Sequence, residues 1–188
     1  MTDQELEGLA RQALNILHTE IRNAGRCSFF LGYHIPGAGL RRMPKVEALI
    51  VARLGEDWLN HGGKKELAFG LLRVCATMAR PEAVVLVTPM NHYRATDAFL
   101  KLPPDRQKFY SASANRNREA VARGYMTVDD SLTALAQTPE RVCISSLITG
   151  QEQPLTNFWR QDEYDGRTKF YVEPDEAMKL LAKLEASG

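Results

Sequence analysis

The chain has 188 residues, a length that fits one domain of ordinary size. Hydrophobic residues make up 44% and charged residues 25%, which is typical of globular proteins and excludes disorder of the chain as a whole. The formal net charge of +1 excludes an overall field that would draw the chain to nucleic acid or to an anionic membrane, so any such affinity must come from a local patch.

The cysteines and the N-terminus indicate the compartment. Cys27, Cys75 and Cys143 are an odd number, widely spaced and set in apolar patterns, so we expect them to be reduced and buried. The first residues lack the basic start and apolar core of a signal peptide, and no apolar run approaches the roughly 18 residues of a membrane span. We therefore expect a soluble cytoplasmic protein that does not enter a membrane.

The first part of the chain predicts a helix followed by two strands. Residues 2–24 have apolar residues at helical spacing, and Thr2 and Glu5 have the spacing of a capping box. Residues 27–35 alternate in the manner of a strand. Residues 40–43 are expected to return as a short edge strand, because a proline follows them directly.

The middle of the chain predicts two helices and the central strand of a sheet. Residues 45–60 and 64–80 each carry apolar side chains with a period near 3.6. Residues 83–87 are apolar without alternation, which indicates a strand covered on both faces. Val85 and Leu86 are therefore expected to be buried on opposite faces of the sheet.

The second half of the chain is less regular. We interpret residues 96–140 as an insertion between the central strand and the C-terminal strands, with one helix candidate at 130–137. Residues 142–148 predict a strand. Residues 158–172 predict a hairpin around an Asp-Gly turn, and a final helix is expected from residue 173.

This order of elements predicts the fold class. Few crossovers of the kind that a parallel sheet requires are present, so the sequence favours an α+β fold. We expect one domain over residues 1–188, with a mostly antiparallel sheet of about five strands and with helices packed mainly on one face.

Two clusters are candidates for binding a small anionic ligand. Gly63, Lys64 and Lys65 lie at the start of a predicted helix, where free backbone amides and lysine side chains attract anions. The motif lacks the spacing and the Ser or Thr of a Walker loop, so a flexible connection with two solvated lysines is the alternative interpretation.

The second cluster follows the central strand. Asn91, His92 and Arg94 offer an amide, an imidazole and a guanidinium at a strand exit, where functional side chains often lie. The alternative is a polar segment that is simply solvated. The two clusters could form one site only if the strand ends near the start of the helix.

Other site chemistry has little support in the sequence. The four histidines show no metal-binding spacing and no CxxC motif exists, so we predict no metal site. No residue is predicted to be catalytic, and no cofactor is expected. Residues 105–124 carry five basic residues, two acidic residues and two aromatic residues, a combination that can bind single-stranded nucleic acid. The excess is modest, so nucleic acid is not the partner that we favour.

The sequence favours a small binding or regulatory domain that acts through a protein partner or a small anionic ligand. The first alternative is a small enzyme acting on an anionic or phosphorylated substrate through the Lys64 and His92 regions. The second alternative is a nucleic-acid accessory protein that uses the basic segment at 105–124. The identity of the ligand and the oligomeric state do not follow from the sequence.

Overall fold

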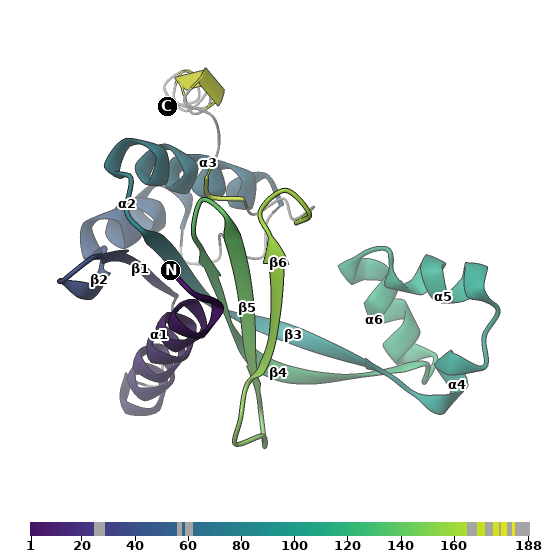
Figure 1. Cartoon of the computed structure of the whole chain (residues 1–188). Helices are drawn as coiled ribbons and strands as arrows, with labels where there is room; N and C mark the ends of the chain where they lie inside the picture. The colour runs from purple at the N-terminus through teal and green to yellow at the C-terminus, as the bar shows by residue number, and fades with distance from the viewer. Residues whose placement is uncertain are drawn as a thin grey trace.

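A computed structural model describes residues 1–24, 29–55, 58, 62–164, 169–171, 175–176, 178–179 and 182 of the chain. Six helices and six strands are defined within this described part (Figure 1). In chain order they are α1 (Asp3–Ala24), β1 (Phe30–Ile35), β2 (Gly39–Arg42), α2 (Pro44–Leu54), α3 (Gly62–Ala79), β3 (Ala83–Ala95), α4 (Asp97–Leu100), α5 (Pro104–Ser111), α6 (Ala114–Ala122), β4 (Met126–Gln137), β5 (Arg141–Ile148) and β6 (Leu155–Arg160).

The six strands form one sheet in the order β2-β1-β3-β4-β5-β6, and every neighbouring pair is antiparallel. The predicted α+β class with an antiparallel sheet is therefore confirmed, with six strands where about five were expected. β3 occupies a central position between β1 and β4, as its uninterrupted apolar run predicted. Val85 and Leu86 are 0% and 4% exposed and belong to different core clusters, so their opposite orientation is also confirmed.

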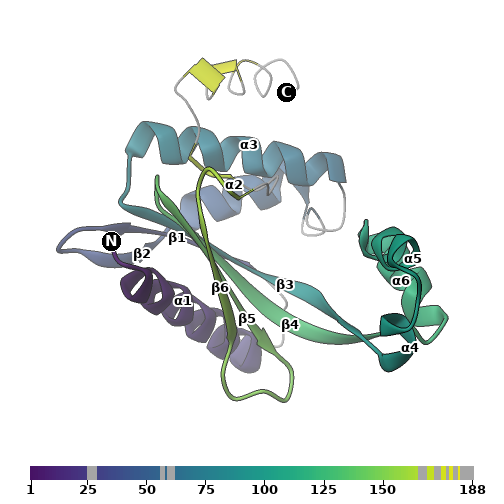
Figure 2. The same cartoon turned by 45° about the vertical axis from the view of Figure 1, so that its right-hand side comes forward.

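Helices cover both faces of the sheet, which corrects the expectation that they would pack mainly on one face. Along one face α1 packs Leu6, Leu14 and Leu17 against the strands, and α2 and α3 cover the other face (Figure 2). The physical reason lies in β3, because Ala83 to Thr88 are all buried and need apolar cover on each side.

The first helices begin and end near the predicted residues. The Thr2 amide donates to Glu5 Oε2 at 2.7 Å and the Glu5 amide donates to Thr2 Oγ1 at 3.2 Å, so the predicted capping box is confirmed. α2 ends at Leu54, earlier than predicted, because Gly55 adopts a φ of 84° that favours glycine. Cys27 and Gly25 lie outside the described residues.

β3 and β4 are longer than the other four strands, and they continue together beyond the ends of those strands. β1 pairs with β3 only as far as Val87, and β5 pairs with β4 only as far as Ser131. Past these points β3 and β4 form a two-stranded ribbon, which we define as residues 91–95 and 126–130. The ribbon leads away from the body of the protein and carries α4, α5 and α6 at its end (Figures 1 and 2).

We call residues 96–125 the tip. Two of its helices, α4 and α6, have side-chain N-caps, since Thr96 and Ser113 accept hydrogen bonds from the amides of Phe99 and Arg116. A core of four buried residues, Phe99, Tyr110, Ala120 and Met126, holds the tip together at the end of the ribbon. This core shares no residue with the two clusters of the body. Ribbon and tip together form the arm.

Two predictions for the second half of the chain are wrong. Residues 130–137, predicted to be a helix, belong to β4, because the twelve residue pairs with β3 override the local pattern. Residues 126–137 of the predicted 96–140 insertion are thus part of the sheet. Within the predicted hairpin at 158–172, the described residues 161–164 and 169–171 are not in a strand, since β6 ends at Arg160 and a turn follows. Its Asp165-Gly166 turn lies outside the described residues.

Residues 169–171 pack on the body without forming a strand. The Phe170 amide donates to Gln137 Oε1 at 3.0 Å, and Arg73 Nε donates to the carbonyl of Lys169 at 2.7 Å. Phe170 is fully buried in the cluster that also contains Trp159. Phe170 and Trp159 therefore share one core, although residues 169–171 are not in a strand. The described residues between 175 and 182 are helical.

Candidate functional site

The first predicted cluster lies in the first turn of α3. Gly63, Lys64 and Lys65 all belong to this helix, which begins at Gly62. Lys64 is half-buried on the body of the protein. The sequence prediction that these residues open a helix is correct, and their backbone amides accordingly lie at a helix N-terminus.

The second predicted cluster lies on the ribbon. Asn91, His92 and Arg94 belong to β3, which continues eight residues beyond the apolar run that the sequence defined. Neighbouring residues of a strand point to opposite faces, so Asn91 points away from the face that His92 and Arg94 share. Asn91 faces Asp130 across the ribbon and His92 faces Asp129.

The ribbon side chains mainly contact one another. Arg94 forms an ion pair with Asp129 at 2.8 Å between Nη2 and Oδ2, and this pair crosses from β3 to β4. Asn91 Nδ2 lies 3.5 Å from the hydroxyl oxygen of Tyr93. The Arg94 side chain is 55% exposed, so its ion pair is a surface contact of small energy. These contacts are typical of a ribbon stabilised by cross-strand pairs.

The two predicted clusters lie in different parts of the molecule. α3 runs along the body, whereas residues 91–94 lie on the arm that leads away from it (Figures 1 and 2). β3 continues to Ala95, well beyond its last pair with β1 at Val87, so its polar residues lie on the ribbon and not beside α3. This length was not visible in the sequence, because the apolar run ends at Val87.

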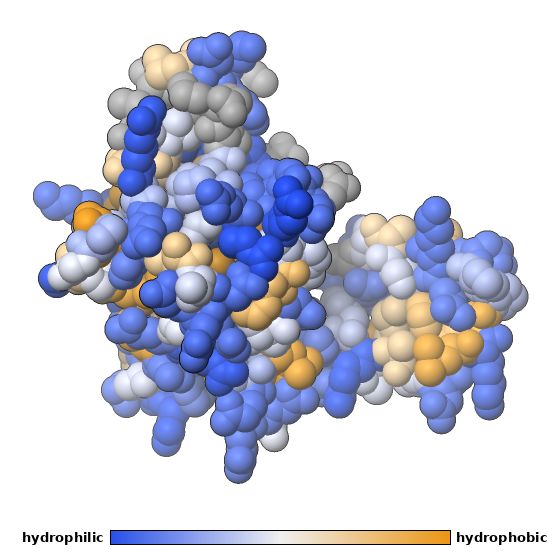
Figure 3. Space-filling view, in the orientation of Figure 1, coloured by the Kyte–Doolittle hydropathy of each residue, from blue (hydrophilic) through white to orange (hydrophobic). Residues whose placement is uncertain are grey.

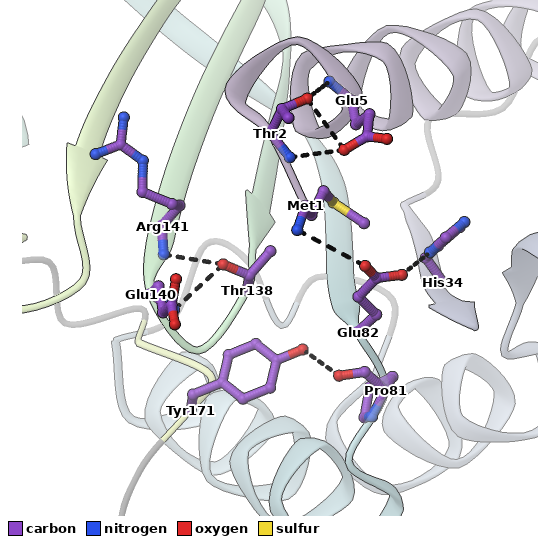
Figure 4. Close-up of polar contacts among 10 residues, drawn as sticks. All are labelled: Met1, Thr2, Glu5, His34, Pro81, Glu82, Thr138, Glu140, Arg141 and Tyr171. Carbon is purple, nitrogen blue, oxygen red and sulfur yellow. Dashed lines mark hydrogen bonds and ion pairs between the residues drawn. The ribbon is translucent and has the colours of Figure 1, made fainter. Parts of the chain in front are cut away.

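A polar cluster that the sequence did not predict lies where α1 begins, next to the β4–β5 turn (Figure 4). Glu82 accepts from His34 Nδ1 at 3.0 Å and forms an ion pair with the Met1 amine at 3.8 Å. The Tyr171 hydroxyl donates to the carbonyl of Pro81 at 3.0 Å.

These contacts join segments that are distant in the chain, and their chemistry is that of structural links. Burial raises the pKa of the Tyr171 hydroxyl, which keeps it protonated as a hydrogen-bond donor. In the β4–β5 turn, the Thr138 hydroxyl accepts from the amides of Glu140 and Arg141 at 3.2 and 2.9 Å. The cluster fixes α1, β1, β3 and residues 169–171 relative to one another.

The thiols do not have the surroundings of nucleophiles. Burial raises the pKa of Cys143 to about 12 and also raises the pKa of Cys75, which favours the neutral thiol at both positions. Cys143 is fully buried and Cys75 is half-buried. Within the described part of the chain, no group of three or more His, Cys, Asp or Glu side chains could hold a metal ion. None of the described helices is both long and apolar enough to cross a membrane.

The tip presents the most distinctive surface of the described chain. Figure 3 shows it as a lobe set apart from the body, with apolar side chains gathered on its surface. Leu100 is 64% exposed, the largest value among the exposed large hydrophobic residues of the described part. All six basic residues of the tip are exposed: Lys101, Arg106, Lys108, Arg116, Arg118 and Arg123. The basic excess at 105–124 was visible in the sequence, but the exposed leucine beside it was not.

Two aromatic residues of the tip lie inside it, and the other two, Phe109 and Tyr125, are half-buried. Tyr110 is 4% exposed and Phe99 is 6% exposed, and both belong to the tip core. Phe109 is half-buried, and the Arg116 guanidinium lies over its ring at 4.0 Å from the centroid. Arg116 also pairs with Glu119 at 3.0 Å. The basic and aromatic residues that the sequence grouped together are therefore partly used by the tip itself.

No protein-family model matches this chain, and neither the characterised proteins nor the solved structures with which we compared it include a match.

Proposed function

We propose that the protein is a binding module that contacts a protein partner through its arm. The observation that carries this proposal is the tip, a lobe with a small core of its own that is held away from the body by a two-stranded ribbon. Neither of the two body clusters contains a residue of the tip. An element that adds little to the main core but displays an exposed apolar and basic surface is typical of an interaction site.

The construction of the arm also supports the proposal. An isolated two-stranded hairpin is at best marginally stable in water, because few side chains are buried between two strands. Here Met90, next to the ribbon, is 50% exposed, and Val128, within the ribbon, is 43% exposed. Met90 and Val128 lie on opposite faces of these strands, so each face offers one apolar side chain for contact with a partner.

The two alternative functions have weaker support. Base stacking in single-stranded nucleic acid requires accessible aromatic faces, and Tyr110, Phe99 and Phe109 do not offer them. On the ribbon that leads to the tip, Asp130 would repel a phosphate backbone, while the charge of Asp129 is paired with Arg94. An enzyme on an anionic substrate would need Lys64 to act together with His92 and Arg94, which lie on the body and on the arm respectively.

The test removes the tip while keeping the sheet. Ala95 and Met126 are paired across the ribbon, so an Asn-Gly turn in place of residues 96–125 closes a two-residue hairpin in the same register. Peptide ligands are selected from a random library displayed on phage against the full chain. Their affinities for the full chain and for the variant are then measured by calorimetry.

We expect the selected peptides to bind the full chain and to lose at least about tenfold in affinity on the variant, because the contact surface is gone. The tryptophan fluorescence of Trp58 and Trp159, both in the body, serves as the control that the variant is folded. Peptides that bind both proteins equally well would show that the partner surface lies on the body and would overturn the proposal.

A further inference from the structure

The charges of the chain are distributed unevenly between the tip and the rest. Residues 96–125 contain six basic and three acidic residues, an excess of three positive charges. Because the whole chain has a net charge of +1, the remaining residues have a net charge of −2. The tip is therefore the positive end of a molecule that is otherwise slightly negative.

The acidic residues of the tip leave several of its cations unneutralised. Glu119 forms ion pairs with both Arg116 and Arg123, at 3.0 and 3.1 Å. Asp97 and Asp105 lie in the first turns of α4 and α5, where they interact favourably with the helix ends. The structure records no ion pair in the described part of the chain for the other four cations of the tip: Lys101, Arg106, Lys108 and Arg118.

Two of these cations lie beside the exposed leucine. Lys101 follows Leu100 directly in the chain. Gln107 Nε2 donates to the carbonyl of Leu100 at 3.2 Å and to the carbonyl of Leu102 at 2.8 Å, so the start of α5 is held against residues 100–102. Arg106, the neighbour of Gln107, therefore starts from a backbone position next to residues 100–102. Leu100, Lys101 and Arg106 are all exposed in this part of the tip.

We propose that the surface formed by Leu100, Lys101 and Arg106 binds an acidic protein segment with an apolar anchor residue. This inference rests on the proposed function and adds the chemistry of the partner. The anchor covers Leu100, which buries apolar surface on both partners. Aspartate and glutamate side chains beside the anchor pair with Lys101 and Arg106, and charge complementarity selects an acidic partner over a basic one.

The experiment uses the full chain and the phage-selected peptides described above. We expect their sequences to be enriched in Asp and Glu on either side of a large apolar residue. Two variants separate the parts of the surface: Leu100→Ser removes the anchor contact, and the double variant Lys101→Glu with Arg106→Glu reverses the charge. Each is expected to weaken peptide binding about tenfold or more, and the charge reversal is expected to remove most of the salt dependence.

Helix α2 offers matched controls on the body. Leu49 is 44% exposed, and Lys45 and Arg53 are exposed one turn to each side of it. Leu49→Ser and the double variant Lys45→Glu with Arg53→Glu therefore repeat the same chemical changes on a different surface. Both are expected to leave peptide affinity within about twofold of the full chain.

Several outcomes would overturn the inference. Selected peptides that depend on the tip but are neutral or basic would contradict the acidic partner and leave the proposed function standing. Loss of peptide binding in the α2 variants, with full binding in the tip variants, would contradict both the acidic partner and the proposed function. A twenty-nucleotide single strand of DNA is titrated as a further probe. The surface would be assigned to nucleic acid instead if two results were found together. The DNA strand would bind and lose its binding in the Lys101→Glu, Arg106→Glu variant, and no acidic peptide would be selected.

Discussion

Gln137 is a buried polar side chain that joins two distant segments of the body. It is 0% exposed, and its Oε1 accepts from the Phe170 amide at 3.0 Å and from Gln161 Nε2 at 3.2 Å. A buried amide N–H without an acceptor destabilises the folded protein, because water cannot replace the missing partner. Gln137 therefore links residues 169–171 to the sheet.

We predict that Gln137→Leu lowers the free energy of unfolding by about 1–3 kcal/mol, because the Phe170 amide stays buried without this acceptor. Urea denaturation followed by tryptophan fluorescence measures the change. Gln151 is exposed, so Gln151→Leu is the control and should change stability by less than about 0.5 kcal/mol. A Gln137→Leu protein as stable as the wild type would show that this hydrogen bond contributes little.

Cys143 is predicted to be chemically inert in the folded protein. Burial raises its pKa to about 12, so the unreactive neutral thiol predominates at pH 8. In a protein with Cys27→Ser and Cys75→Ser, a disulfide reagent should label Cys143 only after unfolding in guanidinium chloride. Rapid labelling without denaturant would contradict the burial of this thiol.

At the scale of the elements, sequence patterns correctly predicted the helices and strands that depend on interactions between residues close together in the chain. The apolar stripe and the capping box of α1, the apolar period of α3 and the continuous apolar run of β3 were all visible in the sequence. Each depends on residues close together in the chain. The central position of β3 also followed, because only a strand covered on both faces is apolar throughout.

The elements that the sequence did not reveal depend on distant partners. β4 contains Asp129, Asp130 and Ser131, which are poor strand formers, and only its pairing with β3 makes it a strand. The second half of β3 is also polar, and it too is a strand only through its pairing with β4. Pro89 lies just beyond the last pair of β3 with β1. The candidate site could be predicted only in part: the basic segment was visible, but the burial of Tyr110 depends on the tip core.

The tip is predicted to open before the helices of the body. Its core contains four buried residues, fewer than either core cluster of the body, so less free energy opposes local unfolding. Limited trypsin digestion should therefore cut first at Arg116 or Arg118. A first cut at Arg73, which is half-buried on α3, would show that the tip is the more stable part. Mass spectrometry of the first fragments distinguishes the two results.

At the scale of the whole molecule, we predict that the body and the tip unfold as separate cooperative units, because their core clusters share no residue. Both tryptophans belong to the body cluster under α2 and α3, whereas the tip contains Tyr110 and Tyr125. Fluorescence excited at the tryptophans therefore follows the body alone. Circular dichroism follows the helices of both parts, so a single two-state transition is not expected for this chain.

We predict that replacing residues 96–125 with Asn-Gly leaves the unfolding free energy of the body within about 0.5 kcal/mol, because the clusters share no residue. Urea titration with tryptophan fluorescence measures it. In the full chain, the circular dichroism signal should begin to fall at lower urea than the fluorescence. Coincident transitions in the full chain, together with a destabilised variant, would show that the two parts fold as one.

The pairing of Ala95 with Met126 has a consequence for how this scaffold can change. The polypeptide leaves the sheet and re-enters it at neighbouring positions, so whatever is encoded between them must only have ends that lie close together. Compact folded units commonly meet that condition. The end of the ribbon is therefore an insertion site: a helical hairpin or a small foreign domain could replace the tip there without altering the register of any strand. The same geometry would allow the recognition surface that we propose on the tip to diversify while the body that displays it is preserved.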